Sequence, residues 1–273
     1  FRNRMYNFEL LALYNNSWGD FDFNATLGGN LYKVNNQTIV TTAKDMKIRD
    51  VVALMSFNEV SVEPYSYRKQ INSIYGAVNL GWKHMLYFDA TLRGDQSSTL
   101  PISNNMYIYP SFSGSFVFSE LLKLGDKLPY GKVRMSWAQV GSDTDPYQLG
   151  LVYTKSKFAY PGYTIGYISN GTIPNKDLKP TKTNSFEMGL ELKFLKNRIG
   201  LDFTYYSQLS KNQIMGMASS STSGYGYRLI NAGEIENKGV EIALNTRPIQ
   251  TKDFSWDLNF NFSKNSNKVK KLV

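Results

Sequence analysis

Few residues in this sequence could perform acid–base or metal chemistry. There is one histidine, His84, and no cysteine, so a thiolate metal site, a disulfide scaffold or a histidine-dependent triad has little to draw on. Glu187 and Glu191 share one face of an alternating segment, where paired carboxylates could exchange protons. A strand that lines water explains the same pair more simply. We therefore expect no catalytic residue, no cofactor and no metal, and we expect His84 to be solvated in a tight turn.

Two aspartates have a spacing that could serve calcium. Asp143 and Asp145 lie in "GSDTDPYQLG" (141–150), and oxygen ligands two positions apart occur in calcium loops. Such a loop needs further acidic ligands, and the stretch from Tyr147 to Gly150 has none. We therefore expect a turn that is held by hydrogen bonds from backbone N–H groups to the aspartate side chains.

Tyrosines in two segments are the best candidates for contact with a ligand. The segments are "YTKSKFAYPGYTIGYISNG" (153–171) and "SSSTSGYGYRL" (219–229). Their rings could stack on sugars or peptide side chains, although loop packing or a membrane-interface belt would use the same residues. The Gly-rich "GYGYR" matches no phosphate-binding loop. The predicted ligand-contact residues are Tyr160, Tyr163, Tyr167, Tyr225 and Tyr227.

The net charge of +9 does not indicate a nucleic-acid partner. Binding to nucleic acid requires basic residues gathered on one face or element. Here they are spread over predicted turns, such as "LKNR" (195–198) and "KVKK" (268–271). We therefore expect these basic residues to lie in solvated loops, and we expect no nucleic acid among the partners.

The elements that must position these residues are strands. Apolar and polar residues alternate with period two along the chain, and 19 tyrosines and 16 phenylalanines favour strands further. No apolar run approaches the roughly 20 residues of a transmembrane helix. Each strand is near the roughly 10 residues that span a membrane barrel. The ten predicted strands are 3–14, 21–33, 68–82, 85–95, 108–119, 131–141, 184–194, 199–210, 238–247 and 254–264.

The connections between these strands alternate between short and long. The short ones are 15–20, 83–84, 195–198 and 246–253, the long ones are 34–67, 96–107, 142–183 and 211–237, and 121–131 is intermediate. Within 34–67 only 49–57 is expected to form a short element. An outer-membrane barrel has tight turns at one rim and long loops at the other. A soluble barrel fits the two-faced strands equally well, but the turn alternation and strand length favour the membrane barrel.

The segment "RGDQSSTLPISNNMYIYPSFSGSFVFSE" (93–120) begins with Arg-Gly-Asp, the tripeptide of cell-adhesion ligands. We expect it to be the end of a strand that enters a loop. The second half alternates phenylalanine with serine and predicts a strand with one apolar and one small polar face.

Several blocks resemble the SusC/RagA-type family of TonB-linked outer-membrane transporters. The blocks are 92–120, 133–143, 178–214 and 230–245, followed by 254–269, and their order and spacing fit the family over roughly residues 75 to 273. The first seventy residues are similar only loosely, and the centre of 142–183 has no counterpart. The residues that carry the resemblance are Arg93, Asp95, Ser97, Ser98, Tyr109, Pro110, Glu120, Glu187, Gly189, Asn231, Gly233, Asn237, Gly239 and Glu241.

The resemblance implies an all-β fold, an antiparallel transmembrane β-barrel in the outer membrane of a Gram-negative bacterium. Residues 1–273 would be part of one TonB-dependent receptor β-barrel domain, about ten strands of a larger plugged barrel, with the plug domain and the C-terminal strands absent. Because such a piece has open edges, we do not expect it to insert alone as a working channel.

The implied function is active import of oligosaccharides or oligopeptides, with no enzymatic step. The implied partners are a SusD-like surface lipoprotein, TonB through a segment missing here, the glycan or peptide ligand, and outer-membrane lipid. Two alternatives stay open at this point. A passive outer-membrane porin would lack the plug, and a secreted carbohydrate-binding or adhesin β-protein would turn its apolar faces inward.

Overall fold

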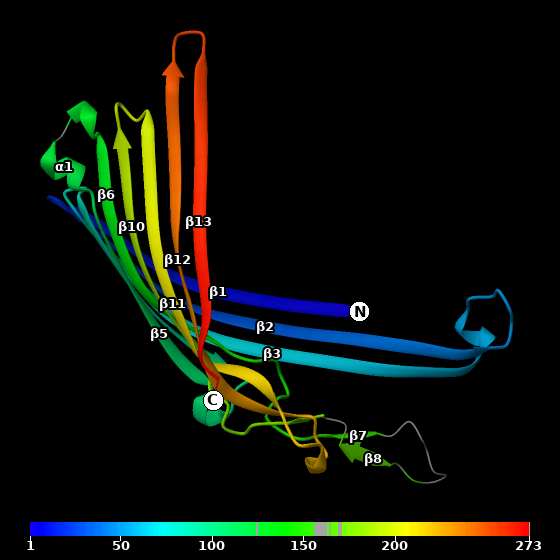
Figure 1. Cartoon of the computed structure of the whole chain (residues 1–273). Coiled ribbons are helices and arrows are strands. Elements are labelled where there is room, and N and C mark those ends of the chain that lie inside the picture. Colours follow the sequence, from blue (N-terminus) through cyan, green and yellow to red (C-terminus); the bar gives the residue numbers. More distant parts are fainter. Residues whose placement is uncertain (124, 156–162, 164, 169–170, 273) are drawn as a thin grey trace.

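The computed structural model describes residues 1–123, 125–155, 163, 165–168 and 171–272. One antiparallel sheet contains nearly all of its long elements, in the order β1-β2-β3-β4-β5-β6-β10-β11-β12-β13 (Figure 1). The bounds are β1 Arg2–Trp18, β2 Phe21–Met46, β3 Phe57–Trp82, β4 Leu86–Ser97, β5 Met106–Phe116, β6 Tyr130–Ser142, β10 Thr181–Phe194, β11 Ile199–Ala218, β12 Tyr227–Gln250 and β13 Ser255–Lys271.

The remaining elements are short. Strands β7 (Tyr153–Lys155) and β8 (Gly166–Ile168) form a separate hairpin, and β9 (Thr172–Ile173) pairs in parallel with the start of β12. The helical turns are η1 (Leu54–Ser56), η2 (Ile102–Asn104), α1 (Phe118–Leu122), η3 (Gly125–Lys127) and η4 (Ser221–Ser223). In the described ranges no helix is both long and apolar enough to cross a membrane.

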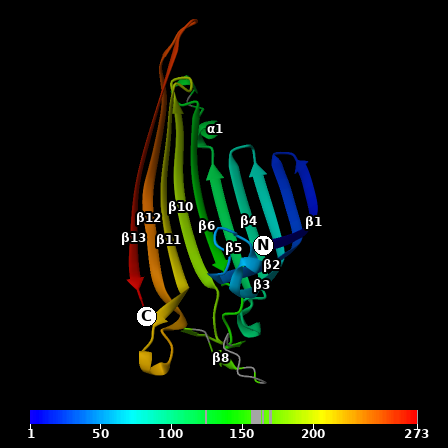
Figure 2. The same cartoon turned by 90° about the vertical axis from the view of Figure 1, so that its right-hand side faces the viewer.

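The long strands lie side by side as an open, curved wall (Figure 2). The connections β1–β2, β3–β4, β10–β11 and β12–β13 are tight, and they share one rim with the longer β5–β6 connection, which contains α1. The connections β2–β3, β4–β5, β6–β10 and β11–β12 lie at the other rim. Lys83 and His84 both have positive φ between β3 and β4, which is the backbone of the two-residue turns that match strand twist. The predicted alternation is therefore confirmed in order except at β5–β6, where the connection 117–129 is longer than three of those at the other rim. His84 lies in a tight turn with its side chain largely exposed.

All ten predicted strands are present, but several are longer than the sequence pattern indicated. The prediction of little structure in 34–67 was wrong, because β2 runs on to Met46 and β3 begins at Phe57. This part of the β2–β3 hairpin projects past the other strands as a two-stranded ribbon (Figure 1). Most of its residues are exposed, so neither face needs to be apolar and the alternation that marks a half-buried strand is missing.

Three smaller differences concern the strand ends. Arg93, Gly94 and Asp95 lie inside β4 rather than at the entry to a loop. Phe118 and Ser119 were predicted as strand but begin α1. β11 continues to Ala218 and β12 begins at Tyr227, so most of the predicted loop 211–237 is strand.

The wall is a single layer and therefore has little interior. Among the described residues, Leu178 is the largest side chain that is fully buried, at 0% exposed. It packs with Leu100 and Tyr107 at the rim of long connections. Elsewhere the side chains point to one of the two broad surfaces of the wall. The kinds of side chain on each surface determine what that surface can contact.

Candidate functional site

The strand registers place most of the large apolar side chains on one surface, here called the apolar face. The rows run across neighbouring strands, for example from Trp82 through Leu86 to Phe116. Near the tight turns the face is aromatic, with the Phe21 and Trp82 ring centroids 6.5 Å apart and those of Trp18 and Phe23 6.0 Å apart. An apolar band bordered by an aromatic girdle is the pattern of a barrel surface that faces lipid.

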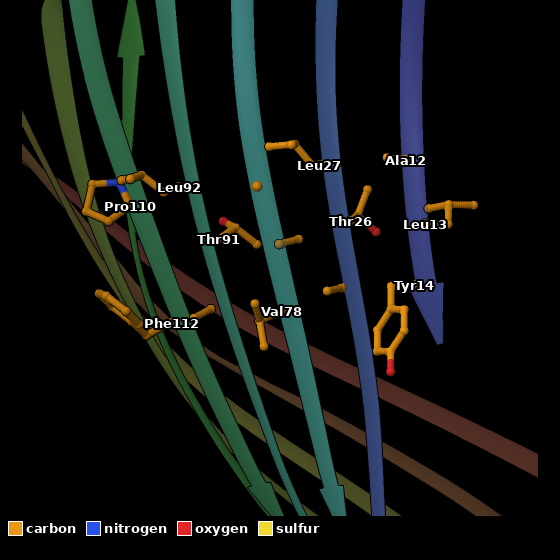
Figure 3. A pocket seen from close by; sticks show the side chains of 14 residues that line it. Ala12, Leu13, Tyr14, Thr26, Leu27, Val78, Thr91, Leu92, Pro110 and Phe112 are labelled. Carbon is orange, nitrogen blue, oxygen red and sulfur yellow. The ribbon is translucent and has the colours of Figure 1, made fainter. Parts of the chain in front are cut away.

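The apolar face is hollowed where small residues meet. A depression of about 580 Å³ is lined by Ala25, Gly76 and Ala90 among others. Tyr14 and Phe112 also line it and are labelled in Figure 3. The surface of this depression is mostly apolar. Because a ligand site also needs placed polar groups, this depression is not the candidate site.

The opposite surface, here called the polar face, carries hydrogen-bonding side chains on every long strand. One chain of bonds crosses three strands, because Asn24 Nδ2 donates to Asn79 Oδ1 at 3.1 Å and Asn79 donates to Asp89. On β5, Ser113 Oγ donates to the other oxygen of Asp89 at 2.8 Å. Such a surface can contact water and polar ligands, and we take the polar face as the candidate site.

Arg93 and Asp95 form the centre of one cluster on this face. Arg93 donates to Asp95 Oδ1 and to Ser73 Oγ, both at 2.9 Å, and its guanidinium lies 5.3 Å from the centroid of the Tyr75 ring. Tyr109 donates to the second oxygen of Asp95, which is 6% exposed. The family-motif residues Arg93, Asp95 and Tyr109 therefore hold one another, and the cluster joins β3, β4 and β5.

Gly189 allows a second charged pair to form across a strand. Arg134 of β6 donates to both oxygens of Asp202 on β11, at 3.1 and 2.9 Å, and to Thr204 Oγ1 at 2.7 Å. Its side chain crosses β10 at Gly189, where a Cβ atom would collide with the guanidinium. Glu187, two positions before Gly189 on the same face, is opposite Ser136 and Tyr206 in the register.

Gly239 has the same role for an aromatic side chain. A Cβ atom at this position of β12 would lie 2.5 Å from the Lys264 carbonyl oxygen of β13 and 2.6 Å from the Tyr206 hydroxyl of β11, so both the neighbouring backbone and the tyrosine need the glycine. On the same strand the Asn237 Oδ1 atom is buried without a hydrogen-bond partner in the described part of the chain. Glu241 lines a polar depression of about 530 Å³ together with Arg134 and Asp202.

Asp143 makes different contacts from those predicted. It accepts hydrogen bonds from Lys69 Nζ at 2.6 Å, from Thr99 Oγ1 at 3.1 Å and from the Ser97 hydroxyl. The predicted Asx turn was therefore wrong, because the carboxylate serves a long-range, largely buried ion pair instead. Neither aspartate belongs to a group of potential metal ligands within the described residues.

Asn231 joins three segments. Its carboxamide accepts from the Lys179 backbone N–H and donates to the Lys179 carbonyl, both at 2.7 Å, and it also donates to the Asn212 carbonyl at 3.1 Å. Asn212 and Gly233 have positive φ of 56° and 81°, so the β11–β12 ladder is irregular here. The motifs around Leu178, Asn212 and Asn231 therefore meet at one junction.

The remaining motif residues are scattered. Ser98 exchanges hydrogen bonds with the backbone of Gln70 at 3.0 Å in both directions. Pro110 lies opposite Leu92 at the hollow of the apolar face, and Glu120 is exposed on α1. Glu191 lies near Lys193, with the two charged groups 3.7 Å apart.

The predicted tyrosines lie at the rim of long connections, except that Tyr160 falls outside the described residues. Tyr163, Tyr167 and Tyr227 are exposed, and Tyr225 is half-buried. The two tyrosine segments meet where Gly226 and Tyr227 donate their backbone N–H groups to the Gly171 carbonyl, each at 2.9 Å. Their contact with a ligand stays a prediction.

Three partners at this site were not identified from the sequence. Lys69, Arg134 and Asp202 each reach a partner at least 68 positions away. Asp202 lies within the predicted strand 199–210, but no local pattern reveals which distant charge it meets.

Comparison with known proteins gives a consistent result. A family model described as TonB dependent receptor-like, beta-barrel matches residues 1–271. TonB-dependent receptor P3 of Formosa agariphila is 28% identical, over 97% of this chain and 27% of the relative. TonB-dependent receptor SusC of Bacteroides thetaiotaomicron is 30% identical, over 77% of this chain and 22% of the relative. The chain thus spans about a quarter of the length of these curated relatives.

Solved structures show the same fold. The structure described as that of the RagAB peptide transporter superposes with a TM-score of 0.90 at 22% identity, over 99% of this chain and 30% of that chain. The outer membrane transporter YddB of Escherichia coli superposes with a TM-score of 0.66 at 13% identity, over 97% and 33%. The predicted fold class, part of an antiparallel barrel, is confirmed.

Proposed function

The chain belongs to the TonB dependent receptor-like β-barrel family, and from that premise we propose that it is barrel wall and extracellular loops of a TonB-dependent importer in the outer membrane of a Gram-negative bacterium. The family consists of receptors and transporters rather than enzymes. The observation that carries the proposal is the two-faced wall, whose apolar face suits lipid and whose polar face suits a wet lumen. Residues 1–273 would be one part of a single barrel domain around a plug.

We propose that the cargo is an oligosaccharide or an oligopeptide. The relatives named SusC and RagAB support this class, since the latter is described as a peptide transporter. The polar face offers amide, hydroxyl and carboxylate groups, which bind either kind of cargo. A SusD-like surface lipoprotein would cover the rim of long connections, and TonB would supply energy from the inner-membrane side.

The test is growth of the source bacterium on single oligosaccharides or oligopeptides as sole nutrients. We expect deletion of the receptor gene to abolish growth on one of these classes while growth on monosaccharides or amino acids continues. Removal of TonB should have the same effect. Uptake that continues without TonB would instead indicate a passive porin. Recovery of the full-length protein in a detergent-free soluble fraction would support the secreted β-protein.

A further inference from the structure

Three basic residues lie close together on the apolar face of β1, β2 and β3, which run side by side in Figure 1. They are Arg4, Lys33 and Arg68, here called the basic cluster, and all three are exposed. Lys33 is two positions after Leu31 and therefore shares its face. The register places Arg4 and Arg68 on either side of Asn35, two positions further along β2. Cations of three neighbouring strands thus gather where their charges repel one another.

The described part of the wall supplies no counter-ion for this cluster. Among the described residues, none of its three members takes part in an ion pair, and the Asn35 carboxamide oxygen between the arginines has no hydrogen-bond partner. The lysines on the same face of β11 and β12 differ. Lys211 lies 3.4 Å from Glu234. Lys238 lies 3.5 Å from Glu236. Basic residues are therefore neutralised at that end of the sheet and left with unbalanced charge on β1 to β3.

The basic cluster lies just beyond the apolar band, toward the rim of long connections. Phe8 and Leu31 are opposite one another in the band, and the next row pairs Tyr6 with Lys33. Trp18, at the tight-turn end of β1, is twelve positions from Tyr6. At about 3.3 Å per residue and a strand tilt of about 40°, this distance is roughly 30 Å of height, which suits an apolar band of about 25 Å with an aromatic residue at each border. The cluster is therefore at the level of lipid headgroups, on the lipid side of the wall.

We propose that the basic cluster binds the phosphate groups of a lipid in the outer leaflet. The inference rests on the proposed function only in placing the wall in the outer membrane with the long connections outside. Lys33 is diagonal to both arginines in the register, so the three long side chains can converge on one anion. A guanidinium group presents paired N–H donors that fit phosphate oxygens.

A lipid fits this position better than a soluble anion does. The cluster borders the apolar band, so a lipid whose phosphate is held by the arginines can lay its acyl chains along Phe8 and Leu31. Both side chains are exposed on the apolar face. A free phosphate ion would gain only the charged contacts, which water and salt weaken at an exposed site.

The test measures lipid binding to the purified full-length receptor in a nonionic detergent by native mass spectrometry. The probes are lipid A with its phosphate groups, the same lipid after removal of the phosphates, and inorganic phosphate as a competitor. The variant is Lys33→Gln with Arg68→Gln. The control is Lys127→Gln with Lys252→Gln, which removes the same net charge from exposed positions in the β5–β6 and β12–β13 connections, at the opposite rim.

In the parent receptor we expect the phosphorylated lipid to bind at least about tenfold more tightly than the dephosphorylated one. Because a basic residue near an anionic lipid surface contributes about a fivefold factor, the double variant should bind the phosphorylated lipid roughly 10- to 30-fold more weakly. Its affinity for the dephosphorylated lipid should not change. The control variant should bind both lipids as the parent does, and millimolar inorganic phosphate should not displace the lipid.

Equal affinity of the parent for the two lipids would overturn the proposal, and this comparison needs no variant. Unchanged binding of the phosphorylated lipid to a double variant of normal electrophoretic mobility would overturn it as well. Displacement by inorganic phosphate would show a site for soluble anions and refute the choice of lipid. The measurement requires neither cargo nor TonB. A receptor that shows the expected lipid binding yet imports no oligosaccharide or oligopeptide would refute the proposed function and leave the lipid site standing.

Discussion

At the scale of single residues, glycine decides where long side chains can lie flat on the polar face. Tyr75 lies over Gly28, Arg134 over Gly189 and Tyr206 over Gly239, each reaching a glycine of the neighbouring strand. A glycine inside a strand has no side chain to pack and loses more chain entropy on folding than other residues. Its presence therefore often marks a place where another group approaches the backbone closely. At Gly189 the approach allows an ion pair that spans β6 to β11.

Gly189→Ala is therefore expected to lower the free energy of unfolding of the full-length receptor by about 1–3 kcal/mol. The added methyl group collides with the Arg134 side chain and separates it from Asp202. Urea unfolding in lipid vesicles measures the change. Gly200→Ala is the matched control, because its Cβ atom would meet nothing closer than 3.9 Å. Equal effects of the two substitutions would contradict the role given to Gly189.

Lys69 and Asp143 should stabilise the folded receptor mainly through their interaction with each other. The two side chains are 17% and 11% exposed, and their charged atoms are 2.6 Å apart. In a double-mutant cycle with Lys69→Met and Asp143→Asn we expect a coupling energy of roughly 0.5–3 kcal/mol. Lys83→Met with Asp20→Asn, a pair 3.5 Å apart and largely exposed, should show less. A larger coupling for that exposed pair would contradict this expectation.

At the scale of elements, the sequence predicted strands wherever apolar residues occupy every second position, because one face of such a strand lies in apolar surroundings. Met188, Leu190 and Leu192 alternate in β10, and that strand was predicted within three residues at its start and correctly at its end. The ribbon of β2 and β3 lacks such a surface, so its strands were missed. The long-range partners of Arg134 and Asp143 were missed for another reason, since side-chain pairs across strands depend on register and not on local pattern.

The ribbon should be dispensable for building the wall. Its outer part pairs only β2 with β3, from Thr41↔Val62 to Met46↔Phe57, while β4 pairs with β3 only from Ile71 onward. Replacing 41–62 by Asn-Gly would close the shortened hairpin with a two-residue turn. We expect the full-length receptor to keep its heat-modifiable mobility in electrophoresis. Loss of that mobility would show that the ribbon takes part in assembly.

At the scale of the whole molecule, a membrane barrel and a soluble β-protein differ in which face points outward. The apolar face points outward in the membrane barrel and inward in the soluble protein. Strand alternation is identical in both cases, and only the surroundings of the apolar face differ. Ala90 on β4 and Ala77 on β3 offer a matched pair of small residues. Ala90 is opposite Val78 on the apolar face, and Ala77 is opposite Thr91 on the polar face.

Single cysteines at these two positions should react with different reagents in the full-length receptor. In the outer membrane, Ala90→Cys should be labelled by a lipid-soluble maleimide and protected from a water-soluble one, because its surroundings are hydrocarbon. Ala77→Cys should show no such preference for the lipid-soluble reagent, since its neighbours are hydroxyl groups on the wet side. In a soluble protein with its apolar faces inward, the Ala90→Cys thiol would be shielded from both reagents, and the Ala77→Cys thiol would react with the water-soluble one. Labelling of the Ala90→Cys variant by the lipid-soluble reagent alone is thus the result that only a membrane barrel produces.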